Sequence, residues 1–143
     1  EMELAFSAPC TVLSKKGYEG GIIAPGFALM SRYLNKQTAL LPKLDSSKLK
    51  LDPKDQEAFG RSTVEAMTLG ITVGFSGMVD ALLEHLLKCL APSGALNLSL
   101  ISTGGSIRQL NSKWATQTQC VDYLTLIGLA EAYQRWLNKE RCN

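Results

Sequence analysis

The stretch Gly17–Met30, GYEGGIIAPGFALM, decides the fold because it passes from a strand into a helix within a few residues. Aromatic and β-branched residues in Gly17–Ala24 favour a strand, and Pro25-Gly26 both ends it and can stand at the entry of a helix. The apolar residues that follow recur at helical spacing: Phe27, Leu29, Met30, Tyr33 and Leu34. We therefore expect a strand that is followed directly by an amphipathic helix.

A second strand is expected on the amino-terminal side of this stretch. Leu4–Ser14 is rich in apolar and β-compatible residues, and Lys15-Lys16-Gly17 is a short polar turn, so the two strands should form a hairpin. Gly20-Gly21 lies in the middle of the second strand, where glycine weakens pairing. The close approach of either a ligand or a second backbone would explain it.

A long helix is predicted beyond the charged connection Leu41–Arg61, which includes a short edge strand at Lys48–Leu51. Ser62 or Thr63 can cap the helix, and Glu65 completes a capping box with Ser62. The helix should run to Leu90. Its first half carries three glycines, and each costs about 1 kcal/mol relative to alanine. Gly70 and Gly74 share one face, which allows the close approach of another helix, either within the chain or in a second subunit.

The last third of the chain continues the alternation of strands and helices. We expect a turn at Pro92-Ser93-Gly94 and then four elements: a buried strand at Leu96–Ile101, a short helix at Ser106–Asn111, a strand at Gln119–Leu124 and an amphipathic helix at Leu126–Arg141. This order predicts a single α/β domain over residues 1–143 with a partly parallel sheet. Thr103-Gly104-Gly105 is either a phosphate contact before a helix or a plain turn.

Composition excludes several classes of protein. The 143 residues carry a net charge of +2, with 45% hydrophobic and 20% charged residues, so one globular domain is expected and a nucleic-acid binder is not. The four cysteines form no C-x-x-C pair and there is one histidine, His85, so free thiols are expected rather than a metal site. Because Ala66–Val79 is shorter than the roughly 20 residues that span a bilayer, we expect a cytoplasmic protein without a membrane segment.

Several motifs taken together resemble the C-terminal half of the type III pantothenate kinases. That family is often written with G-G-x-I-x-P-G, then T-A-x-L-P, then G-x-[ST]-T-x-E-A. In this chain the three motifs stand in that order at Gly20–Gly26, Thr38–Pro42 and Gly60–Ala66. Leu124–Ala130 is similar to the family's closing passage from strand to helix. The resemblance extends over roughly Gly17 to Trp136.

The resemblance implies an RNase H-like, actin-like kinase fold with a mixed sheet flanked by helices, and a homodimer. It implies phosphorylation of pantothenate by ATP, with Mg²⁺ and a monovalent cation such as K⁺, in coenzyme A biosynthesis. By resemblance, the pantothenate side would include Gly20, Gly21, Ile22 and Thr38. The nucleotide side would include Thr103, Gly104 and Gly105, and the dimer contact Gly70, Gly74 and Met78.

The sequence departs from the family in the groups that handle phosphate. The family's D-x-G-N-[ST] loop and G-x-D-R segment do not occur, and Leu4–Thr11 stands where a G-T-A-x-T-x-D strand is expected. The first aspartate is Asp45, so a register shift cannot restore that carboxylate. We expect no catalytic residue in this chain and no catalysis by the chain alone. Three alternatives follow: a reduced homologue, half of an enzyme completed by a separate N-terminal polypeptide, or a non-catalytic dimerising or regulatory domain.

Overall fold

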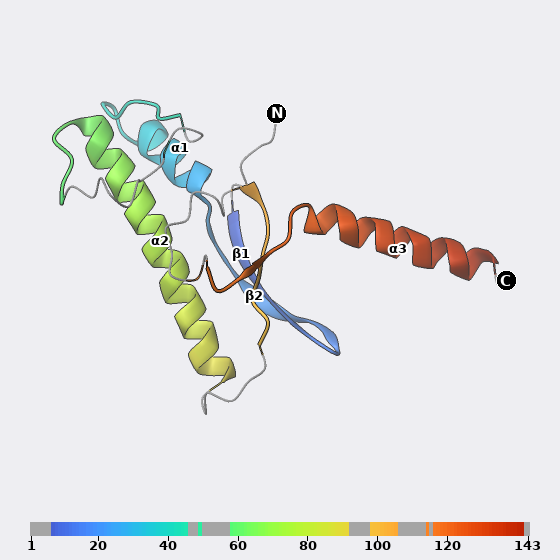
Figure 1. Cartoon of the computed structure of the whole chain (residues 1–143). Coiled ribbons are helices and arrows are strands. Elements are labelled where there is room, and N and C mark those ends of the chain that lie inside the picture. The colour runs from blue at the N-terminus through green and yellow to red at the C-terminus, as the bar shows by residue number, and fades with distance from the viewer. Residues whose placement is uncertain are drawn as a thin grey trace.

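The computed structural model describes residues 7–45, 49, 58–91, 98–105, 114 and 116–141 (Figure 1). In chain order the elements are β1 (Ser7–Ser14), β2 (Gly17–Pro25), α1 (Phe27–Gln37), α2 (Thr63–Leu90), β3 (Ile101–Ser102), β4 (Gln119–Cys120) and α3 (Leu124–Arg141). This order confirms the predicted mixed α/β class. In Figure 1, α1 and α2 lie to one side of the β1–β2 hairpin, and α3 projects to the other side.

The β1–β2 hairpin is antiparallel, as predicted, and contains one irregularity. Val12 pairs with Gly20 and Leu13 pairs with Tyr18, so β2 carries one extra residue at this point. Gly20 has φ +135°, a conformation that L side chains rarely adopt, and a Cβ on Gly21 would collide with the carbonyl oxygen of Cys10. Two explanations were open for this glycine pair, a ligand or a second backbone. The backbone of β1 lies close to the glycines, so the second explanation is met within the hairpin.

A small core joins α1 to α2. The side chain of Phe27 is fully buried, and its ring meets that of Phe75 edge to face, with centroids 5.5 Å apart and an interplanar angle of 78°. Ile71 and Leu49 complete the buried cluster. Gly26 stands at the amino end of α1, where its carbonyl oxygen accepts hydrogen bonds from the amides of Leu29 and Met30. The predicted passage from strand to helix is confirmed.

The predicted limits and cap of α2 are also confirmed. The hydroxyl of Ser62 accepts from the Glu65 amide at 3.2 Å, and the Glu65 carboxylate accepts from the Ser62 amide at 3.1 Å. The same carboxylate accepts from the Arg61 amide at 2.8 Å. These bonds satisfy amides at the helix start that have no partner within the helix.

Replacement of Ser62 by alanine should destabilise the protein by about 1 kcal/mol, because the Glu65 amide loses its acceptor. Urea unfolding followed by circular dichroism measures the loss, and Ser62→Asp, which keeps an acceptor at the cap, should retain most of the stability. Equal losses in the two variants would show that the cap bond is not the cause.

The two C-terminal strands are shorter than the sequence predicts. Leu98–Leu100 lie outside any strand, β3 is confined to Ile101–Ser102, and β4 is confined to Gln119–Cys120. They pair in parallel through Gln119 N to Leu100 O at 2.8 Å and Val121 N to Ser102 O at 2.9 Å. Tyr123, with φ +56°, turns the chain, so α3 begins at Leu124 rather than at Leu126.

Within the described ranges, the strands form two separate two-stranded sheets rather than one mixed sheet. The predicted turn at Pro92-Ser93-Gly94, the helix at Ser106–Asn111 and most of the edge strand at Lys48–Leu51 lie outside the described residues. Leu49 alone of that edge strand is described, and it is buried in the core.

Among the residues described, α2 is the one helix that is long and apolar enough to cross a membrane. An 18-residue window has a mean hydropathy of 1.5, and 28% of it is buried. The core helix of a soluble protein meets the same criteria, and α2 places Ile71 and Phe75 in the core. The absence of a membrane segment therefore stays a prediction.

Candidate functional site

The structure places Gly20, Gly21 and Ile22 together on β2, beside β1. Ile22 is half-buried and pairs with Cys10. Burial raises the pKa of the Cys10 thiol above its ordinary value, so this thiol stays protonated near neutral pH and is a poor nucleophile. This part of the hairpin therefore offers backbone groups and an apolar side chain to a ligand, and no reactive group.

Thr38 directly follows α1, in a segment whose path is set by two side-chain hydrogen bonds. The Thr38 hydroxyl donates to the Leu34 carbonyl at 2.6 Å, and the Asn35 amide group donates to the Leu41 carbonyl at 2.7 Å. Thr38 is exposed and its hydroxyl oxygen can still accept a hydrogen bond. Its position suits contact with a molecule outside this chain.

Thr103, Gly104 and Gly105 follow β3 and are all exposed. Gly104 has φ +97°, so the loop takes a turn that glycine permits. Because β3 and β4 are parallel, their carboxyl ends lie at the same edge, where Asp122–Tyr123 leads into α3. The Thr118 hydroxyl, which directly precedes β4, donates to the Ser102 hydroxyl at 2.9 Å and links the two strands. Sequence reasoning assigned no role to Asp122–Tyr123, because only the parallel pairing brings it there.

The predicted site residues fall into separate groups. Gly20–Ile22 share β2 and Thr103–Gly105 share one loop, whereas Thr38 lies after α1. In the part of the chain that the structure describes, no hydrogen bond connects one group to another. The geometry thus leaves the three groups apart and does not by itself close a pocket around them.

One face of α2 is formed by small exposed residues: Gly70, Gly74, Gly77 and Ala81. A Cβ built at any of the three glycines meets no atom of the described residues within 4 Å. No helix of the described chain therefore crosses α2 at Gly70 and Gly74, and a contact with a second subunit stays a prediction. Gly77, three residues after Gly74, joins this face although it was not among the predicted contacts. Met78 instead packs partly against the core cluster.

The described cysteines are free thiols: Cys10, Cys89 and Cys120. The Cys89 sulfur lies 3.8 Å from Nε2 of the exposed His85, one helical turn away. Among the described residues, no three side chains of His, Cys, Asp or Glu are grouped so that they could hold a metal ion.

The family model of the type III pantothenate kinases matches residues 8–85, more than half of the chain. The chain is thus similar to a family of kinases over the hairpin, α1 and most of α2. It belongs to the type III pantothenate kinase family.

Individual relatives agree with this assignment. The chain is 36% identical to the type III pantothenate kinase 2 of Symbiobacterium thermophilum over 124 residues. These residues make up 86% of this chain and 44% of that protein. It is 32% identical to the type III pantothenate kinase of Exiguobacterium sibiricum, over 88% of this chain and 46% of that protein. It is 33% identical to the type III pantothenate kinase of Dictyoglomus turgidum, over 86% of this chain and 45% of that protein. The chain therefore spans less than half the length of these relatives and matches their C-terminal portion.

Proposed function

We propose that this chain acts as the C-terminal half of a type III pantothenate kinase, an enzyme that phosphorylates pantothenate with ATP on the way to coenzyme A. The family match over residues 8–85 is the observation that carries the proposal. We further propose that the domain has the RNase H-like fold of actin-like kinases. The hairpin that leads directly into α1 and the parallel β3–β4 pair are compatible with that fold.

In this proposal the predicted site residues bind two different substrates. The β2 segment Gly20–Ile22 and Thr38, which reaches toward a neighbouring subunit, bind pantothenate. The Thr103–Gly105 loop binds the nucleotide, because an exposed glycine loop at the carboxyl ends of parallel strands lets backbone amides approach a phosphate. ATP would bring Mg²⁺, and a monovalent cation such as K⁺ would assist.

Phosphoryl transfer itself depends, in our proposal, on residues outside these 143. The transfer depends on positioning and on neutralising the charge of the transferred group, through a base, metal-binding carboxylates and phosphate donors. The sequence contains neither the D-x-G-N-[ST] loop nor the G-x-D-R segment that carry these groups in the family. Residues equivalent to the N-terminal half of the kinase would therefore complete the active site.

Dimerisation through α2 is the second part of the proposal. Glycines within a helix cost stability, and Gly70, Gly74 and Gly77 touch nothing in the described chain. A second copy of α2 against this face would give them a packing role and would cover Val73, which is 56% exposed. We place the protein in the cytoplasm, because free thiols at Cys10, Cys89 and Cys120 suit a reducing compartment.

Ligand binding tests the assignment of the two segments. Pantothenate and ATP should each raise the melting temperature of the purified chain, because a ligand at 100 times its Kd stabilises the native state by about 2.7 kcal/mol. Thr38→Val should reduce the pantothenate shift and leave the ATP shift unchanged. Gln37→Ala, at the exposed last residue of α1 directly before Thr38, should change neither. If neither ligand shifts the melting temperature, a dimerising domain without ligand binding is the better description.

A further inference from the structure

The last two turns of α2 carry a pair of metal-ligating side chains that the proposed function does not use. His85 and Cys89 are both exposed and stand four residues apart, so the helix places them on one face. Sγ of Cys89 lies 3.8 Å from Nε2 of His85. The 143 residues contain one histidine, so no second pair of this kind can occur in the chain.

The distance between the two donor atoms fits a metal ion that is held by both. Zinc binds thiolate sulfur at about 2.3 Å and imidazole nitrogen at about 2.0–2.1 Å, in tetrahedral geometry. These bond lengths place the sulfur and the nitrogen of a tetrahedral zinc site about 3.6 Å apart. The observed 3.8 Å differs from this value by about 0.2 Å. An ion bound to both atoms therefore requires little movement of either side chain.

The backbone around the pair is held in place and carries a favourable charge. The Ala91 amide donates to the Leu87 carbonyl at 2.9 Å and closes the last turn of α2. A site on a helix holds its ligands more precisely than a site on a loop. The carboxyl end of a helix bears a partial negative charge, which attracts cations and disfavours a bare thiolate. Metal binding thus suits this pair better than nucleophilic catalysis, because a bound cation deprotonates the thiol and offsets its charge.

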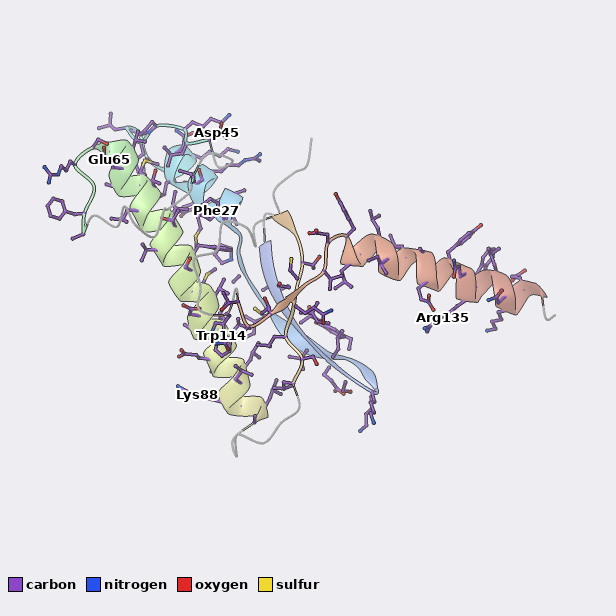
Figure 2. All side chains as sticks on the ribbon, viewed as in Figure 1. Phe27, Asp45, Glu65, Lys88, Trp114 and Arg135 are labelled. Carbon is purple, nitrogen blue, oxygen red and sulfur yellow. The ribbon has the colours of Figure 1, made fainter. Side chains whose placement is uncertain are left out.

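The surroundings of the pair leave room for a cation in contact with water. Lys88 is the basic residue of the last turn, and Figure 2 shows it pointing outward from this end of α2. Its ammonium group can therefore stay in solvent, away from the ion. Within the described ranges, no third His, Cys, Asp or Glu side chain joins the pair. Two of the four positions of a tetrahedral ion are thus left to water.

We propose that Nε2 of His85 and Sγ of Cys89 bind one Zn²⁺ or similar thiophilic divalent cation per chain, with water in the two remaining positions. Binding releases the thiol proton to solvent. Zinc suits the pair because it accepts nitrogen and sulfur ligands, whereas Mg²⁺ takes oxygen ligands. Neither residue belongs to the segments assigned to pantothenate or the nucleotide, so the site does not rest on the proposed function. The bound ion ties the last two turns of α2 together.

Metal titration of the purified, reduced chain tests this site. Calorimetry with Zn²⁺ alone should give one ion per chain, and Cd²⁺ alone should produce the ultraviolet charge-transfer band of a cadmium–thiolate bond. His85→Ala and Cys89→Ala each remove a ligand, so each should weaken Zn²⁺ binding by at least about 10-fold, the smallest loss typical of an outer-shell partner. Cys120→Ala, at another exposed free thiol, should leave the affinity unchanged.

Cys89→His separates the loss of a donor from a loss of structure. This variant keeps two donors one helical turn apart, so it should retain Zn²⁺ binding and lose the cadmium–thiolate band. Because both side chains of the pair are exposed, circular dichroism of every variant should match that of the unmodified chain.

Several results would overturn the proposal. One is the absence of Zn²⁺ binding, and another is binding that survives His85→Ala, because a thiol would then act alone. A folded Cys89→His variant that binds no Zn²⁺ would show that the spacing of the donors does not define the site. Two chains per ion would put a second copy in the positions assigned to water. Equal weakening by Cys120→Ala would mean that exposed thiols bind the ion without a defined site.

Discussion

Gly74→Leu should convert the proposed dimer into monomers while each monomer stays folded. A Cβ at Gly74 meets open space within the described chain, so the larger side chain is tolerated by the monomer. In a two-fold interface the substitution acts twice, once from each subunit. Overpacking costs about 1–3 kcal/mol for each insertion, so the dimer should weaken by about 30-fold or more. Analytical ultracentrifugation over a range of concentrations measures the change.

Cys89→Leu provides the matched control for Gly74→Leu. Cys89 is exposed on the same helix and lies to the side of the small-residue face, so the added bulk should leave the dimer unaffected. A dimer that persists unchanged in Gly74→Leu would remove α2 as the subunit contact. Equal dissociation in both variants would mean that bulk anywhere on α2 disturbs assembly.

Phe75→Ala should cause the largest loss of stability, about 3–5 kcal/mol. Phe75 is 4% exposed and packs edge to face against Phe27, in a core cluster whose buried members are only Phe27, Leu49, Ile71 and Phe75 among the described residues. Domains have total stabilities of about 5–15 kcal/mol, so a large fraction of the total would disappear and α1 would lose its attachment to α2.

Urea unfolding of Phe75→Ala measures this loss, with Val64→Ala as the control. Val64 lies on the same helix and is 49% exposed, so its truncation should change the stability by no more than about 0.5 kcal/mol. A loss below about 1 kcal/mol for Phe75→Ala would show that the aromatic pair does not hold the two helices together.

Local chemistry made the hairpin, α1 and α2 predictable. Ser62 and Glu65 mark the start of α2 because the capping box needs only residues three apart. Pro25 and Gly26 mark the end of β2 for a similar reason. The last third depends on partners distant in the chain. Apolar residues at Leu98 and Leu100 suggested a longer strand, yet pairing with β4 involves only Ile101 and Ser102.

The candidate site was predicted less completely than the fold. Spacing alone identified Gly70 and Gly74. Gly77 could be assigned to the same face only after the structure showed that all three glycines are exposed. The sequence left open whether a ligand or a second backbone lies close to Gly20-Gly21. Only the pairing of these glycines with Val12 and Thr11 shows that the neighbour is the backbone of β1. The exposure of α3 followed from no motif, because amphipathic spacing does not say whether the apolar side of a helix is covered.

An assay of pantothenate phosphorylation by the purified 143-residue chain most directly tests whether phosphoryl transfer depends on residues outside the chain. With ATP, Mg²⁺, K⁺ and radiolabelled pantothenate, the chain should form no more phosphopantothenate than a protein-free blank, while the full-length Symbiobacterium kinase in the same mixture turns over. Product that rises in proportion to the concentration of this chain would contradict the assignment of phosphoryl transfer to residues outside it.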